Sequence, residues 1–380
     1  MLQTPWQRLS RLAGTPGLDA LGDSGNPFLS LPWLLALEHS GVVGTGTGWE
    51  PCHLLFTRDG RPAALLPLYR KHDSRGEYVF DQAWASAYHR HGLSYYPKLV
   101  TAIPFTPVPG PRLLLAAGET AADWLPAVLA AVRAECRDQA ASGWHGLFVE
   151  KDWRDAGLEA GMAIREGCRF HFDNPGHAGF EDFLATLTSK KRKDIRRERR
   201  LLAEAGVACE CLPGPDLDDA AWDFFFACYE RTYHEHGQRP YLNREFFREI
   251  AVTMREHLHL VIARDTAGPL ACALFLHQGD TLHGRYWGGL RRVDGLHFEV
   301  CYYQGIELCL RLGLAGFDPG TQGEHKLLRG FAPRLTHSLH WLAEPAFLAA
   351  VREFVAAASL EVRRYAEAAR EALPYRRSDS

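Results

Sequence analysis

Five side chains capable of acid–base or anion-binding chemistry crowd one short segment, residues 316–331, which reads GFDPGTQGEHKLLRGF. They are Asp318, Glu324, His325, Lys326 and Arg329. A carboxylate or an imidazole can take a proton from a reacting group, and a Lys or Arg can stabilise an oxyanion or hold a phosphate. The segment follows a predicted strand, where α/β proteins often build their sites. We therefore expect a functional site in this loop.

A second group of reactive side chains precedes the loop, in the segment GRYWGGLRRVDGLHFEVCYYQGIE. The candidates for shaping an acceptor pocket are Arg285, Tyr286, Trp287, His297, Glu299 and Tyr302, together with Gln322 of the loop. A metal site built from Glu324 and His325 would need two further ligands. His297 and Glu299 could supply them, but their spacing suits a strand better than a helix start, so we expect no metal. Alternatively, Glu299 stabilises a helix start and Tyr302 is a packing residue.

In the first half of the chain, residues 80–108 are rich in aromatic side chains and proline. Asp81, Tyr96 and Lys98 of this stretch could line a groove that faces the second half and receives the acceptor. Equally, the stretch could form an aromatic core between two domains. The sequence leaves these two interpretations open.

The strongest local charge lies in residues 189–200, SKKRKDIRRERR, where eight basic residues and two acids give a net charge of +6. The whole chain has a formal net charge of −3, so the other residues sum to −9. Such a run attracts polyanions such as RNA, a phosphorylated cofactor or an anionic lipid head, although many charge runs are only solvated helix faces. The predicted phosphate ligands of the run are Lys190, Lys191, Arg192, Lys193, Arg196 and Arg197. At helical spacing, Lys190, Lys193 and Arg197 share one side.

Hydrophobic periodicity places these residues on an α/β fold with an internal repeat. Residues 53–68 and 259–276 each predict a β-hairpin that opens with His and carries Arg-Asp before its turn. In each half a further strand, a helix and another strand follow, which indicates a mixed sheet with helices on its faces. One long basic helix is predicted over residues 180–206, ending at a glycine. We expect two similar domains, residues 1–178 and 179–380.

Composition sets the broad class of the protein. The 380 residues are 46% hydrophobic and 23% charged, which excludes collagen-like, coiled-coil and bulk-disordered chains. No stretch approaches the ~18–20 apolar residues of a membrane helix, and the N-terminus lacks an apolar signal-peptide core. We therefore expect a soluble, cytoplasmic protein without a membrane span. The motifs of a P-loop, a nucleophile elbow, a zinc-protease helix and a Rossmann dinucleotide site are missing.

Several blocks of the sequence together resemble the FemAB-like group, the peptidoglycan biosynthesis/recognition proteins of the GNAT acyl-CoA N-acyltransferase superfamily. The blocks are NPFLSLPWLLALEHSG, GEYVFDQAWASAY, SKKRKDIRRER, GRYWGG, LHFEVCYYQGIE and FDPGTQGEHKLLRGF. The resemblance spans residues 25–365. It implies two tandem GNAT-like modules, with the basic helix near their junction. It also implies transfer of an acyl or aminoacyl group to an amine.

The resemblance implies acyl-CoA or aminoacyl-tRNA as co-substrate, with no tightly bound cofactor. GNAT enzymes that use CoA carry Q/R-x-x-G-x-G/A before their central helix, where backbone N–H groups bind the pyrophosphate. This chain has GGLRRVDGLHFEV at the corresponding place. The departure disfavours CoA bound in the usual manner and favours aminoacyl-tRNA or another donor.

On this resemblance, a neutral amine of a small molecule or peptide would attack an ester or thioester carbonyl, without a covalent enzyme intermediate. Glu324 or His325, with Asp318 as the alternative, would take the amine proton. Lys326 or Arg329 would stabilise the oxyanion or hold a phosphate. Two rival interpretations remain open. One is a non-catalytic protein on the same scaffold that recognises a cell-wall precursor or RNA, and the other is a conventional acetyltransferase that uses acetyl-CoA through a non-standard loop.

Overall fold

Both predicted β-hairpins are present in the structure, a computed structural model that describes residues 3–7, 9–12, 14–22, 24–321 and 323–376. The first joins β3 (His53–Arg58) to β4 (Arg61–Leu66), and the second joins β11 (Leu258–Asp265) to β12 (Gly268–Gln278). Each pair is antiparallel. The first turn consists of Asp59 and Gly60, both at positive φ, which matches the twist of the flanking strands.

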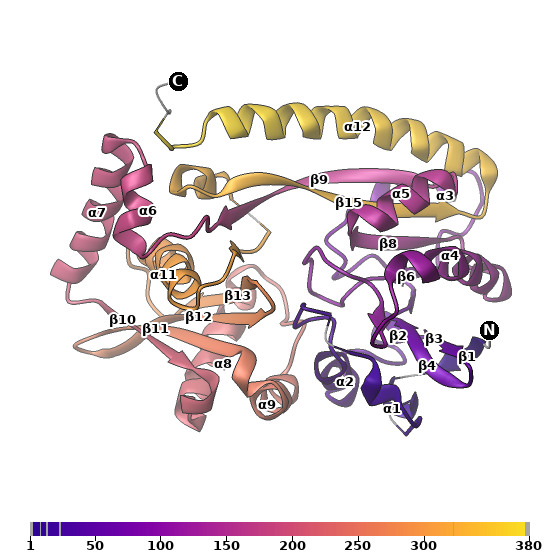
Figure 1. The fold of residues 1–380 in the computed structure, drawn as a ribbon, viewed down its shortest axis with the longest axis horizontal. Coiled ribbons are helices and arrows are strands. Elements are labelled where there is room, and N and C mark those ends of the chain that lie inside the picture. The colour runs from indigo at the N-terminus through magenta and orange to yellow at the C-terminus, as the bar shows by residue number, and fades with distance from the viewer. Residues whose placement is uncertain (1–2, 8, 13, 23, 322, 377–380) are drawn as a thin grey trace. The chain divides into compact units, whose positions relative to one another are not determined.

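The chain forms two compact units, each built from separate stretches of sequence (Figure 1). The first unit comprises residues 1–168, 241–246 and 335–364, and the second comprises residues 169–240, 247–334 and 365–380. A single boundary between residues 178 and 179, as predicted, does not describe this division. Four elements contain residues of both units: β9 (Ala163–Asp173), α9 (Arg244–Thr253), β15 (Ala332–Leu342) and α12 (Pro345–Glu371).

The first unit holds two groups of paired strands, ordered β1-β3-β4-β7 and β15-β8-β6-β5-β2. Its other strands are β1 (Gln3–Gln7), β2 (Trp49–Pro51), β5 (Tyr69–Lys71), β6 (Lys98–Thr101), β7 (Leu114–Leu115) and β8 (Gly143–Val149). Its helices are α1 (Leu9–Leu12), the 3-10 turn Leu18–Ala20, α2 (Leu31–His39), α3 (Gln82–Arg90), α4 (Ala121–Asp138) and α5 (Lys151–Glu159). The apolar side of α4 packs on β3, β4 and β8 to form one core.

The second unit is built on a mixed sheet with the strand order β10-β11-β12-β13-β14-β9. Its further strands are β10 (Ala208–Pro213), β13 (Thr281–Gly289) and β14 (Gly316–Asp318). Its helices are α6 (Phe180–Thr186), α7 (Ser189–Glu204), α8 (Asp219–Glu235), α10 (Leu296–Phe298), a π-helical turn Glu299–Tyr303 and α11 (Gln304–Arg311). Three 3-10 turns, Gly214–Asp216, Arg255–His257 and Glu324–Arg329, complete it.

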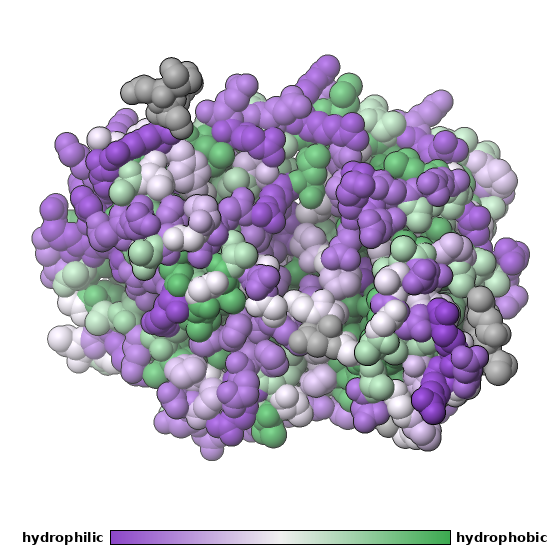
Figure 2. Space-filling model, viewed as in Figure 1, coloured by the Kyte–Doolittle hydropathy of each residue, from purple (hydrophilic) through white to green (hydrophobic). Residues whose placement is uncertain are grey.

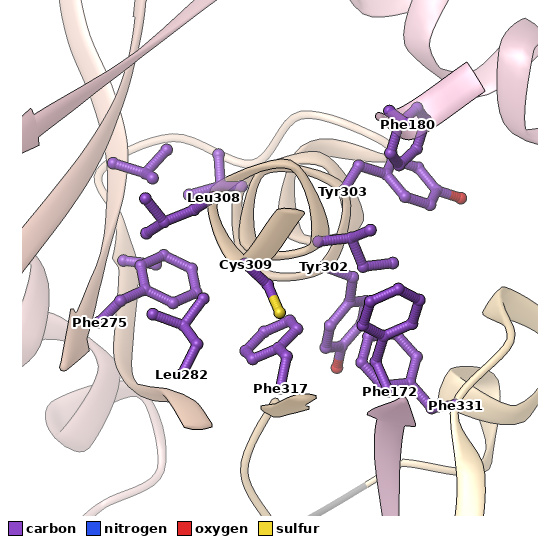
Figure 3. Packing of buried hydrophobic residues seen from close by; sticks show 14 of the residues in the cluster. Phe172, Phe180, Phe275, Leu282, Tyr302, Tyr303, Leu308, Cys309, Phe317 and Phe331 are labelled. Carbon is purple, nitrogen blue, oxygen red and sulfur yellow. The ribbon is translucent and has the colours of Figure 1, made fainter. Parts of the chain in front are cut away.

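Successive side chains of a strand point to opposite faces of the sheet. In the central strands of this sheet the side chains on both faces are apolar, so helices pack on both faces. Ala271, Ala273 and Phe275 of β12 face a core shared with α6, α7 and α11. Figure 3 shows the helical turns of this core, with the Cys309 sulfur directed toward Phe317 of β14 and with Phe275 of β12 beside Leu282. On the other face, Tyr286 packs against the aromatic side chains of α8.

The predicted single basic helix over residues 180–206 is wrong, because two helices, α6 and α7, occupy that range. They are separated by Leu187 and Thr188, whose backbone is extended. Leu187 forms a β-bridge with Tyr375, and the N–H of Thr188 donates to the carbonyl oxygen of Pro374 at 2.8 Å. A distant part of the chain therefore takes hydrogen bonds that a continuous helix would have used.

No helix in the described ranges is long and apolar enough to span a bilayer. No group of three or more His, Cys, Asp or Glu side chains in the same ranges has an arrangement that could hold a metal ion.

Candidate active site

The predicted site loop forms a short 3-10 helix, Glu324–Arg329, and two buried cations hold it in place. Lys326 donates from Nζ to the carbonyl oxygen of Gly320 at 2.7 Å. Arg329 donates from Nη1 to the carbonyl oxygen of His325 at 3.0 Å. The backbone hydrogen bonds of a 3-10 helix have poor geometry, so side-chain bonds of this kind, within the helix and to Gly320 before it, help to hold its shape.

The absence of a side chain at Gly323 leaves the space that the His325 ring occupies. A Cβ added at position 323 would lie 2.0 Å from Cε1 of that ring. Its φ of 107° also belongs to the region that favours glycine. Any side chain at this position would displace the imidazole.

His325 and Tyr302 form the closest polar pair of the site, with 2.8 Å between Nε2 and the hydroxyl oxygen. The His297 ring lies beside both, 6.0 Å from His325 and 5.2 Å from Tyr302 between centroids. Burial, together with the positive charges of Arg329 and Lys326, lowers the pKa of His325 below its ordinary value of 6.5. The imidazole is therefore largely neutral at pH 7 and able to accept a proton.

Tyr302 is presented by the π-helical turn Glu299–Tyr303. Such wider turns occur often at functional sites, because they change the direction of one side chain within a helix. Figure 3 shows the hydroxyls of Tyr302 and Tyr303 pointing in different directions. Tyr302 bonds to His325, whereas Tyr303 donates to Glu198 of α7.

Asp318, at the end of β14, is buried and paired. It accepts hydrogen bonds from the N–H of Gly320 at 2.9 Å and from Nη2 of Arg169 at 3.3 Å. Burial raises its pKa, but Arg169 and His283 oppose burial and bring the value to about 2. Asp318 is therefore an anion at neutral pH and a poor proton acceptor. Burial lowers the pKa of Lys326 to about 8, and the charge of Asp318 limits that fall.

Arg329 engages all three of its nitrogens within the protein. Besides the bond to His325, Nε donates to the Tyr303 hydroxyl at 3.0 Å and Nη2 donates to Glu198 at 3.0 Å. The guanidinium carbon also lies 3.6 Å from the Phe298 ring centroid. These contacts join the 3-10 helix to α7, which leaves Arg329 poorly placed to bind a phosphate.

The carboxylate of Glu299 is likewise hydrogen-bonded to side chains of the second unit. Arg199 donates to both of its carboxylate oxygens, at 3.0–3.2 Å, and to Glu307 at 2.6 Å. Gln304 donates to Glu299 as well, at 2.8 Å. Glu299 thus places a buried negative charge in the first turns of the helix that follows β13.

Three of the predicted phosphate ligands lie on the solvent-exposed face of α7. Lys190, Lys193 and Arg197 are exposed and lie on one side of the helix, opposite the buried Ile195 and Leu202. Figure 2 shows hydrophilic residues gathered at the left of the view, over this helix. The sharing of one side by these three cations is as predicted.

The other cations of the run are engaged close by. Arg192 donates to the Ser189 hydroxyl at 3.4 Å, Lys191 lies 3.5 Å from Asp194, and Arg196 pairs with Glu181. Only part of the predicted phosphate-binding set therefore presents its charge without a neighbouring acid in the part of the chain that the structure describes.

In the first unit, Lys98 is fully buried and pairs with Asp81 and Glu77. Tyr95 donates to Asp81 at 2.6 Å, and its hydroxyl lies 3.3 Å from Nε2 of His145. Burial raises the pKa of Glu77 to about 7 in spite of Lys98. Tyr96, predicted beside Asp81 and Lys98, is half-buried, and its hydroxyl lies 2.8 Å from the Ser74 hydroxyl.

The structure brings together some of the predicted residues and separates others. Trp287, His297, Tyr302, His325, Lys326 and Arg329 gather around the 3-10 helix. Arg285 precedes Tyr286 on β13, and Tyr286 belongs to the α8 face of the sheet. Glu324 is exposed and accepts from the Tyr365 hydroxyl at 3.0 Å. Gln322 lies outside the described residues.

Four contributors to the site escape the sequence analysis: Arg169, Glu198, Arg199 and Tyr303. A signal for two of them exists in the sequence. Glu198 and Arg199 fall at helical spacing between Ile195 and Leu202, on the apolar side of the basic run. An acid on that side indicates a buried partner rather than a solvated charge. Nothing in the sequence pattern points to Arg169, which pairs with Asp318 across β9 and β14.

Comparisons with known proteins agree with this fold. The sequence matches the FemAB-like family, described as peptidoglycan biosynthesis/recognition, over residues 3–377. No curated protein matches the sequence. FemX has a similar structure, with a TM-score of 0.54, 11% identity, and 93% of this chain and 100% of that chain covered. L-PGS from Bacillus licheniformis is similar with a TM-score of 0.52, 10% identity, and 88% and 98% covered. These likenesses confirm the predicted mixed α/β fold.

Proposed function

Because the chain belongs to the FemAB-like family, we propose that it is an acyltransferase that moves an acyl or aminoacyl group from an activated donor to an amine. The observation that carries the proposal is a neutral imidazole, His325, held against a tyrosine hydroxyl beside a buried lysine. Acyl transfer to an amine needs a proton acceptor and a group that stabilises the oxyanion. These side chains supply both.

In the proposed reaction, the amine nitrogen attacks the donor carbonyl carbon, and the bond from that carbon to the leaving oxygen or sulfur breaks. In the tautomer that this reaction requires, His325 takes the amine proton on Nδ1 while its Nε2–H donates to the Tyr302 oxygen, 2.8 Å away. The proton then passes to the leaving group. Lys326, whose pKa of about 8 keeps it mostly charged at pH 7, stabilises the oxyanion.

We propose that the donor's phosphates lie along Lys190, Lys193 and Arg197 of α7. The Glu198–Arg329 contact joins this helix to the turn that carries His325, which supports a shared donor site. The segment GGLRRVDGLHFEV lacks the Q/R-x-x-G-x-G/A pattern, which disfavours a pyrophosphate bound there in the usual manner. Aminoacyl-tRNA is accordingly the preferred donor, with acyl-CoA as the alternative, and the acceptor is an amine-bearing small molecule or peptide related to cell-wall precursors.

Ligand-dependent melting tests the donor directly. We expect aminoacyl-tRNA at 100 times its Kd to stabilise the protein by about 2.7 kcal/mol, with binding that weakens steeply as salt rises. Acetyl-CoA and a long-chain acyl-CoA at the same concentration are the comparisons. A shift in melting temperature with either CoA ester and none with aminoacyl-tRNA would reject the tRNA donor and retain the acyltransferase.

Charge reversal on α7 tests the donor surface. We expect the triple change of Lys190, Lys193 and Arg197 to Glu to lower the slope of log affinity against log salt for tRNA binding by about 2–3, since each phosphate contact contributes roughly 0.7–0.9. Filter binding across a salt series measures the slope.

The matched control for this variant changes three exposed cations of the first unit to Glu. They are Arg61, Arg75 and Arg90. The net charge changes equally in both variants, so an equal loss of slope in the control would show a general effect of charge and not a site on α7.

A further inference from the structure

Residues 365–376, here called the C-terminal segment, contact the 3-10 helix Glu324–Arg329, the turn that carries His325. The hydroxyl of Tyr375 donates to the carbonyl oxygen of Gly330 at 2.6 Å. Gly330 is buried, closes the 3-10 helix and has a φ of 86°. A Cβ there would lie 3.1 Å from the Tyr375 oxygen, a tight contact that would push the hydroxyl back by a few tenths of an ångström. Burial raises the pKa of Tyr375 to about 12, which keeps its hydroxyl a donor.

The backbone around Tyr375 is itself fixed by the break between α6 and α7. The N–H of Thr188 donates to Pro374 at 2.8 Å, and the N–H of Arg376 donates to Thr186 at 2.9 Å. The side chain of Arg376 adds a bond from Nε to the carbonyl oxygen of Leu187 at 3.2 Å. Tyr375 therefore reaches Gly330 from a backbone that is held on both sides.

Two more side chains of the same segment contact the ends of the loop. Tyr365 donates to Glu324 at 3.0 Å, and Arg370 donates to the carbonyl oxygen of Pro333 at 3.3 Å. Two backbone hydrogen bonds close the end of the 3-10 helix. The N–H of Gly330 donates to the carbonyl oxygen of Leu327 at 3.1 Å, and the N–H of Phe331 donates to that of Lys326 at 3.3 Å. The segment thus brackets the turn from its first residue to just beyond its last.

We propose that Tyr375 is a positioning residue for His325, and that the C-terminal segment belongs to the active site. The inference rests on the proposed function, in which His325 is the base. Without the Tyr375 hydroxyl, the backbone at the end of the 3-10 helix loses one of its outside anchors, the one on Gly330, and the imidazole shifts relative to Tyr302. Displacements of about 1 Å at a reacting group can cost as much as 10²-fold in rate.

The experiment compares Tyr375→Phe, which removes only the hydroxyl, with Arg376→Ala, which weakens the tail's other anchor without touching the turn. We expect Tyr375→Phe to lower kcat about tenfold with KM unchanged, and Arg376→Ala to keep the wild-type kcat. We also expect faster exchange of the Phe331 amide proton and a changed pKa of His325 by NMR titration in Tyr375→Phe alone. Thermal melts confirm that both variants are folded.

The proposal is overturned if Tyr375→Phe keeps the wild-type kcat and His325 titration, or if Arg376→Ala reproduces its losses, since the tail would then only add general stability. The two NMR readouts need no substrate. If no acyl transfer is found for the wild type, a shift confined to Tyr375→Phe still supports the positioning contact. Unchanged NMR values in that case would reject it.

Discussion

Replacing His325 with alanine is expected to lower the rate of acyl transfer by about 10²–10⁴-fold, the usual contribution of a general base. The loss should fall on kcat, because the imidazole acts on the proton that leaves the amine during the reaction. In the wild type, kcat should decline as the pH falls below 6.5. Burial and the neighbouring cations lower the pKa of His325, so the decline is centred below that pH and not at it. Single-turnover rates across pH 5–8 measure both effects.

Glu324→Gln is the matched control for this change, because Glu324 is the neighbouring residue but points to Tyr365 at the surface. We expect it to keep most of the activity. If His325→Ala and Glu324→Gln both transfer the acyl group at the wild-type rate, the base lies elsewhere. If only Glu324→Gln is impaired, the carboxylate takes the role that we assign to the imidazole.

Replacing Lys98 with methionine is expected to destabilise the protein by about 3–5 kcal/mol at pH 8, the cost of leaving a buried charge without its partner. Glu77 and Asp81 would then be buried carboxylates that have lost their nearest cation. Lys98 itself is fully buried, so no solvent screening reduces the effect. Urea unfolding of the wild type and the variant measures the difference.

The pH dependence of this difference has a definite sign. Burial raises the pKa of Glu77 to about 7 even beside Lys98, and loss of Lys98 raises it further. The folded variant therefore prefers the protonated carboxyl, and its deficit relative to the wild type shrinks as the pH falls from 8 toward 5. Lys151→Met, at an exposed ion pair with Asp155, should cost far less stability at either pH, because solvent screens a surface pair. A deficit for Lys98→Met that is equally small would show that the cluster is hydrated.

Local patterns carried the prediction of the hairpins, because strand alternation and turn residues act over a few positions. The same holds for the cationic side of α7, where helical spacing alone brings Lys190, Lys193 and Arg197 together. The single helix over residues 180–206 failed because its break depends on Pro374 and Tyr375, nearly two hundred residues away in sequence. The residue types around Leu187 do not indicate that it pairs with Tyr375.

Within the site, the sequence predicts which residues gather there better than it predicts what each of them contacts. His325 and Tyr302 were both predicted, and the structure places them in contact. Arg329 and Glu299 were predicted to face substrates, yet each is held by a partner on α7. A charged side chain in a loop looks the same in sequence whether it meets a ligand or another residue of the protein. Only the three-dimensional pairing separates the two.

The interleaving of the two units has a consequence for synthesis of the protein. The first unit needs residues 335–364 to complete its strands, and the second needs residues 365–376 to fix the α6–α7 junction. Neither unit can therefore finish folding while α12 is still inside the ribosome, even though domains usually fold as units, the N-terminal one first, as they emerge. The two units are therefore expected to complete folding together, once α12 and the residues that follow it have emerged.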